Sequence, residues 1–236
     1  MRGMSGVVSG WLGARGSRNM QYSDRIQGGR MPVIVVANPK GGVGKSTLAT
    51  NIAGWWARQG HAVMLGDTDR QQSARQWLAL RPPQAAAIRG WESRDGDDLV
   101  RPPKGVSHRV LDTPAGLHGK RLDAVMKLAD HILVPLQPSP FDIAATHAFL
   151  QALRSHRRAH RVRLGLVAMR VKEHTHAVEH LHEFLAALGQ PPVAELRDTQ
   201  NCVHLAARGL TLWDVAPGRV ERDLQQWTPL TVRMDT

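Results

Sequence analysis

The 236-residue sequence is poor in cysteine, in long apolar runs and in acidic residues. Its single cysteine, Cys202, excludes an internal disulfide and fits a reducing compartment. No apolar stretch reaches the roughly 18–20 residues that a membrane-spanning helix needs. Hydrophobic residues still make up 42% of the chain, which is enough to bury the core of one ordinary domain.

The shortage of acidic residues leaves the chain strongly basic. Its 31 Lys and Arg against 20 Asp and Glu give a formal net charge of +11, of which residues 1–30 contribute +4 and residues 31–236 contribute +7. The basic character therefore belongs partly to the folded part. Nucleic acid or another polyanion is a reasonable partner, although composition alone does not choose between them.

Residues 1–30 differ from the rest of the chain. They are rich in Gly, Ser and Arg, show no apolar periodicity, and lack the continuous apolar run of about 7–15 residues that a signal peptide requires. We expect a flexible N-terminal extension over residues 1–30, which could lie upstream of the natural start, and one folded domain over residues 31–236.

From residue 31 onward, short runs of Val, Ile and Leu alternate with helical segments, and this order predicts βαβ units. The fold class is therefore α/β, a single domain with a mostly parallel central sheet flanked by helices. The expected strands cover residues 33–37, 62–66, 109–112, 131–136, 164–168 and, more weakly, 193–196.

Apolar residues three and four apart predict helices within residues 122–129 and 181–188, and a last helix is expected after Pro217 within residues 211–227. Residues 81–105 contain four prolines, Pro82, Pro83, Pro102 and Pro103, and are expected to form an irregular surface loop.

The first strand runs into a glycine-rich segment of the kind that binds phosphate, Lys40-Gly41-Gly42-Val43-Gly44-Lys45-Ser46-Thr47, and a helical pattern follows. Glycines let backbone N–H groups turn toward phosphate oxygens, and the following helix adds the positive end of its dipole. Lys45 would place a charge on the β- and γ-phosphates, and the Ser46 hydroxyl would ligate Mg²⁺. The general phosphate-loop pattern fails at one position, where Pro39 replaces the first glycine.

This variant resembles the deviant Walker A loop of ParA/MinD ATPases, in which an additional lysine, here Lys40, reaches across a dimer to the partner's nucleotide. The resemblance covers residues 31 to about 227 and implies a P-loop NTPase fold with ATP and Mg²⁺ as cofactors. Residues 40–47 would bind the phosphates, and Lys40, Lys45 and Asp69 are the catalytic candidates.

Carboxylates follow two further strands. Asp67-Thr68-Asp69 resembles the second signature of the family, with Arg70 where proline is usual, and strand-end carboxylates face the ligand crevice of open α/β sheets. Asp69 is assigned to the attacking water and Asp67 to the metal shell, although the two could exchange roles. Asp112 resembles the Walker B carboxylate that contacts Mg²⁺ through water, and residues 113–116 resemble a switch loop. The expected metal set is Ser46, Asp67 and Asp112.

The base pocket has a weaker signature. Arg197 and Asp198 lie where one wall of an adenine pocket is expected, while Ala168-Met169-Arg170 replaces a segment in which the family often carries asparagine. The choice of ATP therefore comes from the resemblance.

Basic residues near the C-terminus are the DNA-binding candidates, since ParA-like proteins use such residues on the dimer surface. The contacts of Arg208, Arg219 and Arg222 would go to DNA phosphates, giving non-specific, salt-sensitive binding. Another arginine run, within residues 154–163, fits a solvated helix end. His176 and His180 could face one metal on a helix, although neighbouring glutamates indicate a solvent-facing surface.

The resemblance implies a cytoplasmic, ATP-dependent homodimer that associates with the nucleoid through non-specific DNA. Slow hydrolysis, stimulated by a ParB-like or adaptor protein, would release it and so position a plasmid, a chromosome region or a protein assembly.

Three alternatives remain. A MinD-like membrane-associated switch needs a C-terminal amphipathic helix, but Pro229 interrupts the chain's end, so no membrane partner is expected. An iron–sulfur carrier would need paired cysteines. A binding module with an inactive ATPase site would conflict with the intact Lys45, Ser46, Asp69 and Asp112.

Overall fold

The computed structural model describes residues 32–94, 98–99 and 104–234. The chain divides into two units, Met1–Met31 and Pro32–Thr236, and the second unit contains the fold described below. The predicted extension over residues 1–30 lies outside the described residues.

A seven-stranded sheet, parallel in every pairing, forms the centre of the second unit. Its strand order is β3-β2-β6-β1-β7-β8-β9. The strands are β1 (Val33–Val36), β2 (Val63–Asp67), β3 (Ile88–Trp91), β6 (His108–Asp112), β7 (His131–Leu136), β8 (Arg163–Val171) and β9 (Ala194–Arg197). Strands β1, β2 and β6 are buried along their whole length, as parallel strands covered on both faces should be. The predicted fold class is confirmed.

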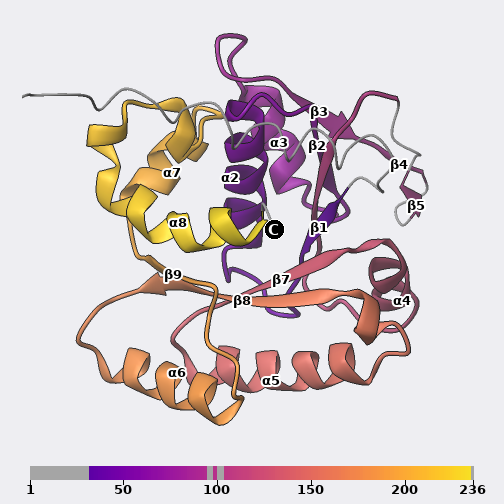
Figure 1. Ribbon diagram of the computed structural model, residues 1–236, viewed down its shortest axis with the longest axis vertical. Helices are drawn as coiled ribbons and strands as arrows, with labels where there is room; N and C mark the ends of the chain where they lie inside the picture. Colours follow the sequence, from indigo (N-terminus) through magenta and orange to yellow (C-terminus); the bar gives the residue numbers. More distant parts are fainter. Residues whose placement is uncertain (1–31, 95–97, 100–103, 235–236) are drawn as a thin grey trace, which may run out of the picture. The chain divides into compact units, whose positions relative to one another are not determined.

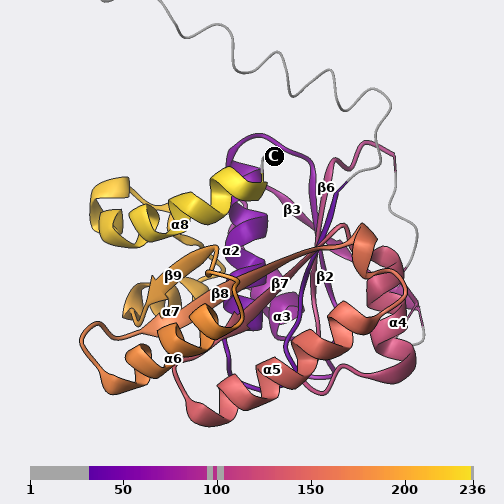
Figure 2. The same cartoon turned by 60° about the horizontal axis from the view of Figure 1, so that its bottom comes forward.

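Helices cover both faces of the sheet (Figures 1 and 2). One face carries α2 (Lys45–Arg58), α3 (Ser73–Leu80), α7 (Gln200–Ala206) and α8 (Glu221–Met234), and the other carries α4 (Gly119–Leu128), α5 (Pro140–Ser155) and α6 (His176–Ala187). Short 3₁₀ turns η1 (Ala159–Arg161), η2 (Leu212–Asp214) and η3 (Pro217–Arg219) join these elements.

The core on the α2 face joins segments that lie far apart in the sequence. Trp55 and Trp56 of α2 pack in one apolar cluster with Trp77 of α3 and Trp227 of α8. Trp56 is fully buried and Trp55 is 6% exposed, so both tryptophans belong to the core. The cluster holds the C-terminal helix against the helix that follows the glycine-rich loop.

The prediction that residues 81–105 form only a loop is wrong. Strand β3 pairs in parallel with β2 at the edge of the sheet, and β4 (Ser93–Arg94) and β5 (Asp98–Leu99) form a separate antiparallel pair. Arg89 and Gly90 of β3 are exposed, so the strand carries no continuous apolar run, and burial of Trp91 anchors it instead. Edge strands of this kind leave little signal in the sequence.

The expected interruption at Pro229 is also wrong, since α8 runs through this residue to Met234. A proline inside a helix removes one backbone hydrogen bond, but Trp227, Leu230 and Met234 are buried on either side of it and hold the helix in place. None of the helices in the described part of the chain has both the length and the apolar character needed to cross a bilayer.

Candidate functional site

The glycine-rich loop leaves β1 at the middle of the sheet, between β6 and β7, and leads directly into α2. Gly42 and Gly44 have φ values of +75° and +96°, which favour glycine. A Cβ on Gly44 would also lie 2.8 Å from Cε of Met169, closer than carbon atoms approach. The positive φ is what favours glycine at position 44, since the flexible end of the Met169 side chain can shift, whereas Val43 turns its side chain into the core.

Side chains outside the loop hold its backbone. The buried Asn38 amide donates to the Pro135 carbonyl at 2.8 Å and to the Thr146 hydroxyl at 2.9 Å, and its oxygen accepts the Lys40 N–H at 2.8 Å. Gln137 donates from Nε2 to the Gly42 carbonyl at 2.8 Å. The loop is therefore positioned by β7 and α5, a role for Asn38 that the sequence analysis missed.

A cavity of about 780 Å³ opens over the loop, and we call it the phosphate cavity. Its lining includes Gly41, Gly42, Gly44, Lys45, Ser46 and Thr47 on one side and Thr68 and Asp69 on the other. The 14-residue helix α2 begins at Lys45 and adds the positive end of its dipole to this wall. These groups together suit a polyphosphate.

Lys45 is held inside the loop. Its Nζ donates to the Lys40 carbonyl at 2.7 Å, and its side chain is largely buried. Burial lowers the pKa of Lys45, while the nearby Asp112 and Asp69 act in the opposite direction. An anionic ligand would compensate this partly desolvated charge.

Ser46 and Asp112 form the part of the site that fits a metal ion. Ser46 Oγ donates to Asp112 Oδ2 at 2.5 Å, and Asp112 is only 2% exposed. Its other oxygen, Oδ1, is buried without a hydrogen-bond partner in the described structure. Burial raises the pKa of Asp112 to about 7, and the Ser46 hydrogen bond opposes this. A divalent cation would relieve the isolated buried oxygen, and Mg²⁺ prefers such oxygen ligands.

Asp67 is held by backbone N–H groups around the start of α3. Its Oδ1 accepts the Asp69 N–H at 2.9 Å, and its Oδ2 accepts the N–H groups of Ala74 and Arg75 at 2.8 and 3.3 Å. The carboxylate thus anchors the first turn of α3 and is not among the described residues that line the phosphate cavity. Asp112 is likewise absent from the described lining, and Asp67 lies beside it in the β2–β6 register, so the predicted place of Asp67 in the metal shell stays a prediction, whereas Asp69 borders the cavity.

Lys40 is partly exposed, and it is absent from the described lining of the phosphate cavity. Its backbone contributes the carbonyl that receives Lys45, while its predicted role toward a partner's nucleotide stays a prediction. The described residues contain no cluster of three or more His, Cys, Asp or Glu side chains able to hold a metal, and His176 pairs instead with Glu179.

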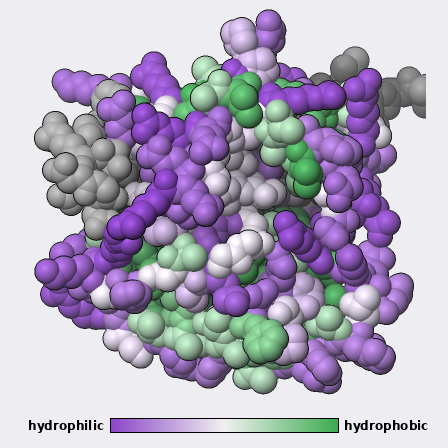
Figure 3. Space-filling view, turned by 180° about the vertical axis from the view of Figure 1, so that it is seen from behind, coloured by the Kyte–Doolittle hydropathy of each residue, from purple (hydrophilic) through white to green (hydrophobic). Residues whose placement is uncertain are grey.

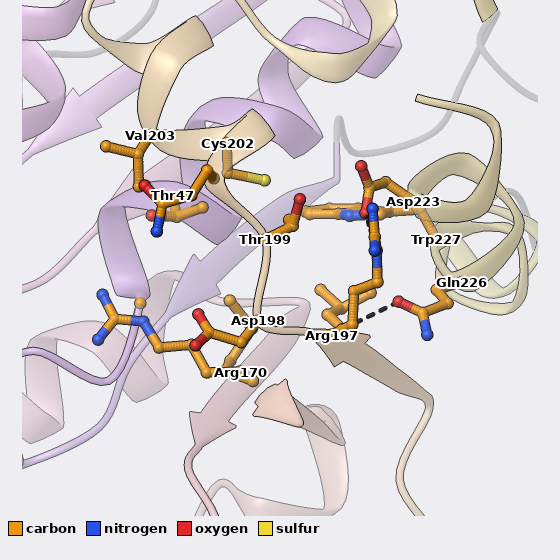
Figure 4. A pocket seen from close by; sticks show the side chains of 14 residues that line it. Thr47, Arg170, Arg197, Asp198, Thr199, Cys202, Val203, Asp223, Gln226 and Trp227 are labelled. Carbon is orange, nitrogen blue, oxygen red and sulfur yellow. Dashed lines mark hydrogen bonds and ion pairs between the residues drawn. The ribbon is translucent and has the colours of Figure 1, made fainter. Parts of the chain in front are cut away.

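Figure 4 shows residues that line a second, smaller cavity of about 310 Å³. It adjoins the first, because Gly44, Thr47 and Arg170 line both. Arg197 and Asp198 lie on its wall, and their predicted role toward adenine stays a prediction. Asp223 of α8 accepts the Arg197 Nε–H at 2.5 Å and fixes this side chain. The arrangement leaves room for a base beside the phosphates, and we call this cavity the base pocket.

Cys202 also lines the base pocket. Burial raises the pKa of its thiol to about 11, with a smaller contribution from the charge of Asp223. The thiol is therefore protonated near neutral pH, which is not the state of a nucleophile.

Arg170 is a site residue that the sequence analysis did not select. It lies near the carboxyl end of β8 with a φ of +53°, within a shift of register between Ala168 and Val171. Figure 4 shows its exposed side chain beside Asp198. A cation at the junction of two cavities can contact both the phosphates and the base side of a nucleotide, and only its unusual backbone conformation marks it.

The three arginines predicted to bind DNA lie around α7 and α8. Arg208 and Arg219 are exposed, and Arg222 pairs with Glu173 at 2.8 Å on the surface. The structure therefore leaves Arg208 and Arg219 accessible, while Arg222 has an acidic partner.

Known proteins share parts of this sequence. The chain is 38% identical to the maintenance of carboxysome distribution protein A of Gloeobacter kilaueensis over 117 residues, which are 48% of this chain and 52% of that protein. The same-named protein of Halothiobacillus neapolitanus is 28% identical over 163 residues, covering 67% of this chain and 75% of the relative. The chain thus spans about half the length of the first relative and three quarters of the second.

Solved structures share the fold. The ATP complex of a Cyanothece McdA variant has a TM-score of 0.63 at 15% identity and covers 86% of this chain and 98% of that chain. The cell division ATPase MinD of Pyrococcus furiosus has a TM-score of 0.65 at 14% identity, with coverage of 87% and 99%.

The family of CobQ/CobB/MinD/ParA nucleotide binding domains matches residues 34–212, from β1 to η2, a range that includes the phosphate loop but not the α8 residues of the base pocket. Together with the phosphate loop and the parallel sheet, this match shows that the chain belongs to that family, as a P-loop protein of the ParA/MinD type.

Proposed function

We propose that the chain is a slow ATPase that dimerises with ATP, binds DNA without sequence preference in that state, and positions a protein assembly. The observation that carries this proposal is the Ser46–Asp112 pair at 2.5 Å, beside a loop shaped for phosphate, with a buried carboxylate oxygen that has no hydrogen-bond partner among the described residues.

The residues of the site have distinct roles in the proposed reaction. Backbone N–H groups of residues 41–44 and the start of α2 bind the phosphates, and Lys45 neutralises their charge. Ser46 and Asp112 would hold Mg²⁺, which would supply further positive charge to the phosphates. Asp69 borders the same cavity from the end of β2 and would orient the attacking water. Lys40 would complete the site of a second copy.

Two helices link the base pocket to the proposed DNA surface. Val203 of α7 and Asp223 of α8 line the base pocket, while Arg208 and Arg219 lie in the segment between these helices. A nucleotide that contacts α7 and α8 would therefore bias the placement of the arginines. Contacts from these side chains to DNA phosphates need no base readout.

The cargo is inferred from the relatives. Both carboxysome-distribution proteins are named for positioning a protein assembly, and the stretch shared with the first of them reaches 38% identity. We infer a protein assembly as cargo, an adaptor protein that stimulates hydrolysis, and a cytoplasmic location on the nucleoid in the ATP state.

The MinD-like membrane switch fits less well. Membrane binding by a C-terminal helix requires an apolar face that is available to lipid. In α8 that face is buried, because Trp227, Leu230 and Met234 pack in the core. The nucleoid is therefore favoured over the bilayer as the surface to which the chain binds.

The proposal is tested by binding to non-specific duplex DNA with ATP, with ADP and without nucleotide. Binding should require ATP, weaken steeply at raised salt, and disappear in Lys45→Ala. Arg208→Glu and Arg219→Glu should weaken it, whereas Arg157→Glu, an exposed control in the turn after α5, should not. ATP turnover without DNA binding in any state would overturn the DNA part of the proposal and direct the search to liposomes and protein partners.

A further inference from the structure

A third cavity, of about 550 Å³, lies between α4 and the loop that follows β6, and we call it the α4 groove. Its apolar lining comes from three segments of the chain: Leu111 of β6, Leu117 of the loop, and Ala124, Val125 and Leu128 of α4. Seen from behind, the surface gathers apolar side chains over the side of the sheet that carries α4 and α5 (Figure 3). Neither the phosphate loop nor the base-pocket residues of β9 and α8 line this groove.

Charge is distributed unevenly around the groove. Lys120 and Lys127, seven positions apart on α4, are exposed at its rim, with Ala124 between them. Among the described residues that line the groove, three are basic and none is acidic. Asp123, the acidic residue of α4, instead pairs with His156 at 3.0 Å. The α4 groove therefore has an apolar lining and a basic rim.

The α4 groove shares a wall with the phosphate cavity. Thr68, Pro114 and Arg121 line both. The backbone N–H and the hydroxyl of Thr68 also donate to the Asp112 carbonyl, at 3.1 and 3.2 Å. An occupant of the groove would thus contact residues that also surround the phosphates, so that each ligand can affect the affinity for the other.

We propose that the α4 groove binds an acidic segment of a partner protein that inserts apolar side chains between α4 and the loop. Lys120 and Lys127 are separated by about 10 Å along the helix axis, a spacing that suits carboxylates distributed along a peptide better than one small anion. The chain's own segments are poorer occupants, because residues 1–30 carry +4 and a second copy carries +11. Opposite charge on the partner would also increase the rate of association.

The proposal rests on the proposed function only for its link to ATP, since peptide binding itself requires no hydrolysis. Peptides that bind the full chain are selected from a random library of 12-residue peptides. The affinity of the selected peptides is then measured on variants of the chain. Enriched peptides should combine acidic and large apolar residues. Their affinity should fall about tenfold in Lys120→Glu/Lys127→Glu, because two exposed attractions become repulsions, and should be lost in Ala124→Trp, which fills the groove.

Matched control variants distinguish a loss of binding in the α4 groove from general effects of a changed surface charge or an added tryptophan. Lys104→Glu changes an exposed charge, and Ala148→Trp adds an exposed tryptophan on α5, so neither should alter peptide affinity. A fluorescent ATP analogue is titrated against each variant and against the peptide complex. Peptide affinity should differ at least severalfold between the ATP-bound and nucleotide-free protein.

The outcomes are distinguishable. Absence of enriched peptides, enrichment of basic peptides, or unchanged affinity in Ala124→Trp would overturn the proposal. Loss of ATP-dependent dimerisation in Ala124→Trp, with peptide affinity unchanged, would assign the groove to a second copy and also overturn it. Failure of the wild type to bind ATP would contradict the proposed function, while peptide binding would still decide the groove.

Discussion

Ser46 Oγ donates a 2.5 Å hydrogen bond to Asp112 Oδ2, joining the first turn of α2 to the end of β6 across 66 positions of sequence. The bond brings a hydroxyl and a buried carboxylate to one side of the phosphate cavity, where one carboxylate oxygen has no other partner in the described structure. The pair is therefore the position that we propose for Mg²⁺ among the described residues.

Ser46→Ala should weaken Mg²⁺-dependent ATP binding by about 10–100-fold, because it removes a metal ligand and the group that orients Asp112. Titration of a fluorescent ATP analogue with Mg²⁺ measures the effect. With EDTA in place of Mg²⁺ the two proteins should bind ATP almost equally. An equal loss in both conditions would mean that the substitution damages the loop and not the metal site.

Arg170→Ala should weaken nucleotide binding by about tenfold, the effect of losing one charge-assisted hydrogen bond of roughly 1.5 kcal/mol. Arg170→Gly should bind as weakly, although glycine adopts the φ of +53° without strain. Calorimetric titration with ATP measures both. Unchanged affinity in Arg170→Ala would show that the side chain does not reach the nucleotide.

The free energy of unfolding should fall in acid because the unfolded chain binds a proton at His108 more readily than the folded chain does. Burial, and secondarily His61, lowers the pKa of His108 from 6.5 to about 3 in the folded chain. Between these values the unfolded chain binds a proton that the folded chain does not, so this contribution to stability is present above pH 6.5 and is lost as the pH falls. From pH 7 to pH 5 the loss should be about 2 kcal/mol.

Urea unfolding at several pH values checks this, with His108→Gln as the comparison. The variant should be less sensitive to acid than the wild type, whatever its stability at neutral pH. The exposed His176→Gln should keep the wild-type slope. If the free energy of unfolding fell equally with decreasing pH in the wild type and in His108→Gln, the assignment of this acid sensitivity to His108 would be refuted.

The buried pair of Arg81 and Asp214 should be costly to break. The side chains are 5% and 4% exposed and lie 2.9 Å apart. Burial would raise the pKa of Asp214, but hydrogen bonds from Arg81 and Thr211 reverse this and lower it. Arg81→Met should destabilise the chain by about 3 kcal/mol, because a buried carboxylate loses its partner.

Chemical denaturation measures this change, with the exposed Arg89→Met as a matched control that should have little effect. Asp214→Asn in the Arg81→Met background should recover part of the loss. A cost below about 1 kcal/mol for Arg81→Met would place the pair among ordinary surface ion pairs.

The central strands and the phosphate loop could be predicted because their sequences dictate their structure. Strand β1 is apolar at every position, and its loop needs glycine at positions 42 and 44. Strand β3 could not be predicted in this way, since Arg89 and Gly90 face solvent and the pairing with β2 decides its conformation.

The site residues likewise divide into those that the sequence predicts and those that only the fold reveals. Asp67 and Asp69 look equivalent in the sequence, but only the fold shows that Asp67 binds the N–H groups of α3 while Asp69 borders the cavity. Arg170 carries no pattern, because its left-handed backbone arises from the register shift between β8 and β9. Tertiary contacts decide these positions, and the local sequence does not record them.

The most direct test of the central claim is ATP binding and turnover by the full chain with Mg²⁺. The wild type should bind ATP and hydrolyse it slowly, Lys45→Ala should lose binding, and Asp69→Ala should keep binding while losing turnover. Failure of the wild type to bind ATP, or equal binding by Lys45→Ala, would contradict the assignment of the phosphate cavity as the nucleotide site.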